Sequence, residues 1–175
     1  KKIDLDLASS STAWTSLQDK RISLENIIRK MENIVIAFSG GVDSTFLAVA
    51  ANDILGDKVL MVTAQSPSLA LSELREAKVL AERFGFRHRI IQTNEFENPN
   101  YLANGPRRCY FCKLELHTQL EKLANEEGFK WVASGVNVDD LSDFRPGLAA
   151  SKEFGVRNPL VEAALNKEEI RTLSK

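Results

Sequence analysis

The chain alternates short apolar runs with longer segments in which apolar residues recur at helical spacing. The runs are rich in Val, Ile and Ala, as in strands that are buried on both faces. Strands separated by helices in this way are typical of βαβ units, which form parallel sheets with right-handed crossovers. The pattern therefore predicts one α/β domain with helices on both faces of the sheet and with strands at 34–37, 59–63, 89–91 and 131–133.

The two ends of the chain show different patterns. Residues 1–21 are polar without sustained periodicity, so we expect a mobile arm there. Apolar residues at helical spacing up to Met31 predict a helix that starts at Ser23. Asn166 and Glu169 have the spacing of a capping box and predict another helix start. Because the apolar stripe of that last helix is short, we expect residues 22–175 to be the N-terminal domain of a longer protein.

A glycine-containing segment follows the first strand and precedes a helix. Its sequence is Phe38-Ser39-Gly40-Gly41-Val42-Asp43-Ser44-Thr45, called the glycine loop below. The glycines can adopt positive φ and let an anion approach the backbone, and the helix N-terminus supplies N–H donors. The hydroxyl groups add further donors, and the Asp43 carboxylate could hold a magnesium ion. The segment therefore predicts a phosphate-binding cup, although a simple βα turn with Asp43 or Ser44 as helix cap has the same composition.

The composition and net charge limit the classes of binding partner that we expect. Of the 175 residues, 43% are hydrophobic and 27% are charged, as in a single globular domain. A net charge of −1 gives no global reason to expect binding to nucleic acid or to anionic membranes. No apolar run approaches the length of a membrane span, and no signal-type segment follows the first residues. We therefore expect a cytoplasmic protein without membrane or nucleic-acid partners.

The two cysteines, Cys109 and Cys112, form one C-x-x-C near a predicted helix start. At this spacing the thiols share a helix face, and the helix dipole and nearby basic residues favour thiolates. The pair can be half of a metal or iron-sulfur site, or simply two thiols beside a basic turn. A zinc or cluster site needs three or four ligands, and neither His88 nor His117 completes the set. We expect both histidines at surface or boundary positions.

The predicted topology brings several loops to one edge. In parallel α/β sheets, ligands bind beyond the carboxyl ends of the strands. The glycine loop and residues 64–66 leave strands at that edge. We therefore expect the adenine of a nucleotide to lie near Ala37, Phe38 and Ala64.

Three motifs resemble a known family. Ser39 to Ser44 matches the SGGxDS motif of the PP-loop ATP pyrophosphatases. Residues 106–113 and 135–148, the latter with Asp-Phe-Arg-Pro-Gly-Leu at its end, resemble the LarE-type ATP-dependent sulfur transferases. The resemblance implies a five-stranded parallel sheet of the adenine nucleotide α-hydrolase type, in the order 3-2-1-4-5. It also implies that ATP and pyrophosphate contact Ala37, Phe38, Ser39, Gly40, Gly41, Val42, Asp43, Ser44, Thr45, Ala64 and Gly135.

The chemistry implied by this resemblance has two steps. ATP and Mg²⁺, the ion held by Asp43, adenylate a carboxylate of a pyridinium mononucleotide and release pyrophosphate, after which sulfur is inserted. Lys113 and Arg145 match basic residues that would act beside the nucleotide. Cys109 and Cys112 would bind a 4Fe-4S cluster, with zinc as second choice, but the chain has no third cysteine. The sulfur donor is not identified, and the full-length protein is expected to be a homo-oligomer.

Three other functions are compatible with the same loop. A tRNA-thiolating enzyme would need a wide basic surface, whereas the basic cluster at Arg107, Arg108 and Lys113 is small. An ammonia-dependent amide synthetase, like the NAD and GMP synthetases, would use the same adenylation. A nucleotide-binding module without turnover would bind ATP and release no pyrophosphate.

Overall fold

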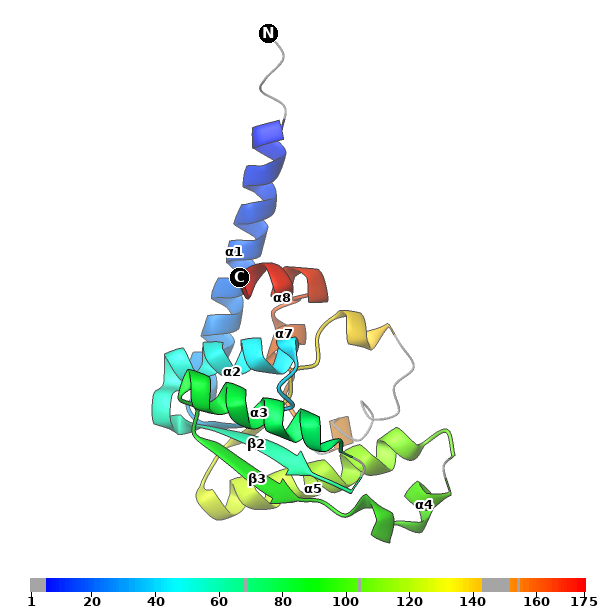
Figure 1. The fold of residues 1–175 in the computed structure, drawn as a ribbon. Helices are drawn as coiled ribbons and strands as arrows, with labels where there is room; N and C mark the ends of the chain where they lie inside the picture. Colours follow the sequence, from blue (N-terminus) through cyan, green and yellow to red (C-terminus); the bar gives the residue numbers. More distant parts are fainter. Residues whose placement is uncertain (1–5, 68, 104, 143–151, 154) are drawn as a thin grey trace.

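The computed structural model describes residues 6–67, 69–103, 105–142, 152–153 and 155–175, and side chains from Ser16 onward except those of Glu95 and Cys109. Strands and helices alternate through most of this chain (Figure 1). The helices are α1 (Asp6–Met31), α2 (Val42–Leu55), α3 (Leu71–Phe84), α4 (Pro99–Leu102), α5 (Arg108–Glu127), α7 (Pro159–Glu162) and α8 (Lys167–Leu173). The strands are β1 (Ile34–Ala37), β2 (Val59–Gln65), β3 (His88–Gln92) and β4 (Trp131–Ala133), and the 3-10 turns are η1 (Gly56–Lys58), η2 (Glu95–Glu97) and η3 (Asp139–Leu141).

The sheet is parallel, with strand order β3-β2-β1-β4. This confirms the predicted fold class and the first four positions of the predicted order. The fifth strand was predicted wrongly, because the described residues form four strands and only an isolated parallel bridge between Ala133 and Arg157 beyond β4. Arg157 donates its N–H to Val132 O (2.9 Å). The ladder ends there because Pro159, which has no N–H, begins α7 two residues later.

Each face of the sheet packs against its own helices, because side chains alternate along β1. Ile34 and Ile36 join the larger core, which includes residues of α1, α2, α3 and α8. Val35 lies on the opposite face and packs with Leu120 of α5. Helices therefore cover both faces of the sheet, as predicted (Figure 1). The loops that follow the strands lie at the edge formed by the carboxyl ends of the strands.

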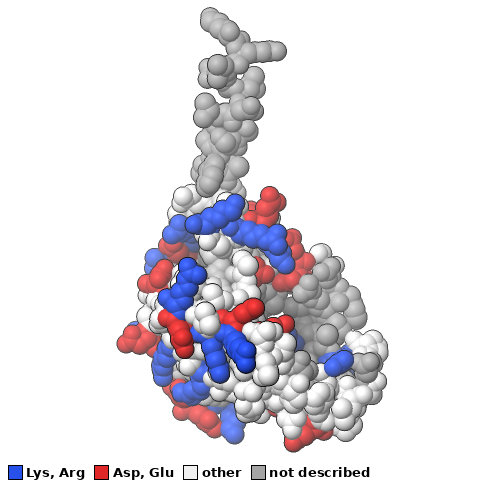
Figure 2. Space-filling model, viewed as in Figure 1, with Lys and Arg blue, Asp and Glu red and all other residues white. Residues whose placement is uncertain are grey.

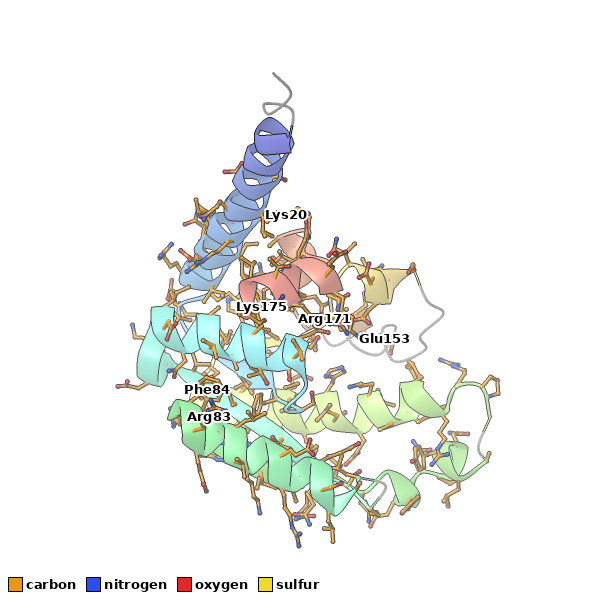
Figure 3. All side chains as sticks on the ribbon, turned by 45° about the horizontal axis from the view of Figure 1, so that its top comes forward. Lys20, Arg83, Phe84, Glu153, Arg171 and Lys175 are labelled. Atoms are coloured by element: carbon orange, nitrogen blue, oxygen red, sulfur yellow. The ribbon has the colours of Figure 1, made fainter. Side chains whose placement is uncertain are left out.

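Helix α1 begins at Asp6, well before the predicted start at Ser23. Its first half stands clear of the rest of the molecule in Figure 1. The sequence of residues 6–21 lacks the sustained apolar stripe from which a helix is predicted, although Leu17 packs against the core. The second half packs on the domain: Leu24 and Ile28 are buried, and Lys20, which is labelled in Figure 3, forms an ion pair with Glu169 of α8 (2.7 Å).

The predicted capping box at the start of α8 is confirmed. Asn166 accepts a hydrogen bond from Glu169 N (2.9 Å), and the Glu169 carboxylate accepts one from Asn166 N (3.0 Å). Ile170 is fully buried, so this short helix is held by packing as well as by its cap. On the face in Figure 2, acidic and basic side chains are interspersed. No helix in the described part of the chain has the length and apolarity needed to cross a membrane.

Candidate nucleotide-binding site

The glycine loop turns the chain from β1 into α2 at the carboxyl edge. Phe38 continues the sheet, donating its N–H to Val62 O (2.9 Å). Gly40 adopts φ +81°, a region that favours glycine, whereas Gly41 is extended with φ −68° and forms the N-cap of α2. The predicted positive φ is therefore confirmed for one glycine of the two.

Gly40 is also required by packing. A Cβ built on it would lie 3.2 Å from the Ala77 Cα in α3. The glycine loop is thus pressed against the helix that follows β2. This contact fixes the glycine loop against α3.

Ser39 and Ser44 close the cup from within. Their hydroxyl oxygens lie 3.0 Å apart, and Ser44 Oγ also accepts the Ser39 N–H (3.3 Å). Ser39 Oγ in turn accepts the Gly41 N–H (3.3 Å). Both hydroxyls therefore lie at the N-terminus of α2, where the first N–H groups of a helix can bind an anion.

Two side-chain oxygens of the glycine loop, Asp43 Oδ1 and Thr45 Oγ1, are buried without a hydrogen-bond partner among the residues that the structure describes. Leaving a buried polar atom unsatisfied costs about 1–3 kcal/mol, so such atoms commonly mark binding sites. Asp43 Oδ2, by contrast, accepts a hydrogen bond from Asn137 Nδ2 (3.0 Å). A carboxylate oxygen without a hydrogen-bond donor, next to the N-terminus of a helix, fits a ligand of a magnesium ion that bridges phosphates.

The predicted adenine region lies where β1 and β2 end. Ala37 and Ala64 are half-buried there. The Phe38 ring lies in the core, edge-on to Phe86 and His88 at 5.7 Å from each ring, so it faces away from the loops of this edge.

The Phe38 carbonyl is held by a buried hydroxyl. Thr63 Oγ1 donates to Phe38 O (2.7 Å) and lies 2.7 Å from His88 Nε2. Since the Thr63 proton is used on Phe38, His88 is the donor in the second bond. Burial, with a smaller effect of Lys78, lowers the pKa of His88 and favours this neutral donor form.

Gly135 follows β4 and touches the first turn of α2. A Cβ built on it would lie 2.8 Å from both the N and the Cα of Ser44. Gly135 was predicted to contact the nucleotide. The structure places it behind the glycine loop, against the backbone of its helix, where no larger residue fits.

An apolar groove of about 600 Å³ runs over α2 between α1, α3 and α8. Gly40 and Thr45 line it at the glycine loop, and Leu80 and Phe84 line it from α3. Phe84 is 42% exposed and is labelled in Figure 3. The groove thus reaches the glycine loop from the side of α2.

The first turn of α5 carries the C-x-x-C. Cys112 is half-buried and Lys113 is exposed, whereas the Cys109 side chain lies outside the description. The Arg107 guanidinium lies 4.4 Å from the centroid of the Tyr110 ring. No group of three or more His, Cys, Asp or Glu side chains that could hold a metal was found in the part of the chain that the structure describes. The site predicted at the cysteines is therefore not completed by these residues.

The remaining predictions for single residues concern Arg145 and His117. Arg145 lies outside the described residues. His117, predicted at the surface or boundary, is only 2% exposed on α5. Burial first, and the charge of Lys113 second, lowers the pKa of His117 to about 4. The prediction was wrong because His117 shares the inward face of α5 with Leu120 and Ala124.

The sequence did not single out Asn137 as a functional residue. Its signal was weak: one asparagine after a strand, followed by two aspartates in an otherwise polar loop. An Asx turn is common in such loops, and nothing local indicates that the side chain reaches Asp43, 94 positions away.

A protein-family model matches the first part of the chain. Residues 17–100 match the NAD synthase family model. The matched region includes the fold's first strands and the glycine loop, whose residues Ser39 to Ser44 carry the SGGxDS motif of the PP-loop ATP pyrophosphatases, so this part of the chain is similar to that family.

Two relatives and two solved structures sharpen the comparison. The chain is 47% identical over 159 residues to an uncharacterized protein of Synechocystis sp., covering 91% of this chain and 59% of that protein. It is 32% identical to the pyridinium-3,5-bisthiocarboxylic acid mononucleotide synthase of Lactiplantibacillus plantarum, covering 91% and 58%. The chain therefore spans under two thirds of these relatives.

The solved structures share the fold. The NH3-dependent NAD synthetase of Campylobacter jejuni aligns with a TM-score of 0.67 at 16% identity, covering 90% of this chain and 72% of that one. The U34-tRNA thiolase of Methanococcus maripaludis, solved with its [4Fe-4S] cluster, also has a TM-score of 0.67, at 17% identity, covering 91% and 63%.

Proposed function

We propose that this chain is the ATP-binding domain of an adenylating sulfur transferase of the LarE type. The observation that carries the proposal is the glycine loop, which places the buried, unpartnered oxygens of Asp43 and Thr45 beside the N-terminus of α2. The relative that synthesises a bisthiocarboxylic acid mononucleotide supports a pyridinium mononucleotide as substrate. The homo-oligomeric state of the full-length protein and its cytoplasmic location are parts of the same proposal.

In the adenylation step, a carboxylate oxygen of the substrate forms a bond to the α-phosphorus of ATP. The bond between that phosphorus and the oxygen bridging to the β-phosphorus breaks, and pyrophosphate leaves with the electron pair. The N–H groups at the start of α2 and the hydroxyls of Ser39 and Ser44 bind the leaving pyrophosphate. A magnesium ion held by Asp43 would neutralise part of the charge that develops on it.

In the second step, sulfur at the oxidation level of sulfide attacks the acyl carbon and AMP leaves, giving a thiocarboxylate. Cys109 and Cys112 would provide two ligands of a 4Fe-4S cluster, with zinc as second choice. The other ligands must come from outside the described residues, so we assign no step to a cluster. Lys113 and Arg145 would neutralise the substrate and nucleotide phosphates.

An ammonia-dependent amide synthetase is the second candidate, because the family model that matches residues 17–100 is that of NAD synthase. Both functions share the adenylation and differ in the attacking nucleophile. Mass spectrometry of the product distinguishes them. Sulfide should give a thiocarboxylate in one case, and ammonium should give an amide in the other.

The test of the proposed function is the identity of the phosphate products. With ATP, Mg²⁺ and a carboxylated pyridinium mononucleotide, the protein should release AMP and pyrophosphate. Asp43→Asn should lower this rate by about 100-fold or more, because a neutral amide does not replace the charge that holds the metal. Asp53→Asn, at an exposed position of the same helix, is the matched control and should retain the rate. ADP and orthophosphate as products would refute the proposal.

A further inference from the structure

The segment that leaves β4 is fitted to the glycine loop. At Gly135 the backbone passes so close to Ser44 that a Cβ would be 2.8 Å from the Ser44 Cα. Two residues later, the side chain of Asn137 is fully buried. The close approach at Gly135 thus brings Asn137 within reach of the first turn of α2.

Asn137 uses both ends of its side-chain amide. Oδ1 accepts the N–H groups of Asp139 (2.9 Å) and Asp140 (3.2 Å), and Nδ2 donates to Asp43 Oδ2 (3.0 Å). Two backbone donors on Oδ1 fix the orientation of the amide, since a flipped NH₂ group would face those N–H groups. Nδ2 is therefore held toward Asp43.

The turn that carries Asn137 is anchored from the C-terminal side. Val138 donates its N–H to Leu165 O (3.1 Å), and Asp139 Oδ2 accepts the N–H of Lys167 (2.9 Å) at the start of α8. The position of Asn137 is thus set by the end of β4 and the start of α8, and not by the glycine loop itself.

We propose that Asn137 is a positioning residue for the metal ligand Asp43, an inference that rests on the proposed function. The Asn137 amide donates a hydrogen bond to Asp43 Oδ2 and, being neutral, does not offset the negative charge of the carboxylate. Asp43 Oδ1, which is buried without a partner among the described residues, is thereby directed to the metal-nucleotide complex. Without Nδ2 the carboxylate can rotate about its side-chain torsions, and it binds the metal less well.

The test measures ATP binding with and without Mg²⁺ by calorimetry. Asn137→Ser keeps a short oxygen that can accept the N–H groups of the turn but cannot reach Asp43. The increase in ATP affinity caused by Mg²⁺ should fall by about tenfold, while binding of metal-free ATP changes less than twofold. Asn98→Ser is the matched control, because the Asn98 side chain also accepts a backbone N–H (2.9 Å, from Asn100) but caps α4. It should keep the full magnesium effect.

A double-mutant cycle separates positioning from a merely structural role. In the Asp43→Asn background, Asn137→Ser should have almost no further effect on the magnesium-dependent affinity. Additive losses, or equal losses with and without Mg²⁺, would overturn the inference, as would an unchanged magnesium effect in Asn137→Ser.

If the unaltered protein shows no magnesium-dependent ATP binding, the proposed function fails and the inference fails with it. Asn137→Ala, compared at a temperature where it remains folded, should lose the same magnesium effect and also some stability.

Discussion

The glycine loop and the first turn of α5 both lie at the carboxyl edge of the sheet, but they are built differently. The glycine loop is fixed by backbone contacts: Gly40 packs on Ala77, and Gly135 packs on Ser44. Its polar side chains, apart from the two unpartnered oxygens, bond to one another or to Asn137. The start of α5 instead presents a half-buried Cys112 and an exposed Lys113, without a completed group of metal ligands among the described residues.

The difference reflects the chemistry of the two sites. An anion site can be made from N–H groups at one helix terminus, so a short segment and its immediate neighbours suffice. A cluster or zinc site needs three or four side chains that converge from several segments. The glycine loop should therefore bind its ligand independently of the cysteines.

The largest expected effect concerns pH and the anchoring of α5. The pKa of His117 is lowered to about 4, below its ordinary value of 6.5, so the folded state favours the neutral ring. The stability from this group is complete above pH 6.5 and is lost as the pH falls through 4, by about 3 kcal/mol in total, most of it between pH 6.5 and 4.5. Denaturant unfolding at pH 7.5 and 4.5 should show this loss.

The control for His117 is a variant that does not titrate. In His117→Gln the part of the pH dependence that comes from His117 should disappear, whatever the stability at neutral pH. Identical pH slopes in the two proteins would show that the ring is not held neutral by burial.

The second effect concerns the close contact behind the glycine loop. Gly135→Ala should lower the free energy of unfolding by about 2 kcal/mol, because the new methyl group meets the backbone of α2. It should also weaken magnesium-dependent ATP binding by moving Asn137 away from Asp43. Gly105→Ala, where no atom among the described residues beyond the chain neighbours lies within 4 Å of the added Cβ, should change stability by less than about 0.5 kcal/mol. Equal stability of the two variants would contradict the packing argument.

The sequence predicted the parallel sheet, the glycine loop and the cap of α8, because each depends on residues that are close together in the chain. It missed the helical state of the first part of α1, which has no sustained apolar stripe, and the burial of His117, which depends on the face of α5 that packs against the sheet. It also gave Asn137 no role and did not reveal that Gly135 packs on Ser44, since both contacts join the segment after β4 to α2. Such contacts depend on how closely two distant elements of the fold approach each other. No local sequence pattern encodes that distance.

The smallest expected effect is the most direct test of the separation between the two regions. Cys112→Ser should change the magnesium-dependent affinity for ATP by less than twofold, since Cys112 lies on α5 and the contacts that fix the glycine loop come from β1, α2, α3 and the end of β4. The same variant should lower the iron bound after anaerobic purification if Cys112 is a cluster ligand. Asp43→Asn is the reciprocal control, because it should abolish the magnesium effect and leave bound iron unchanged. A tenfold loss of ATP affinity in Cys112→Ser would mean that the two regions form one coupled site.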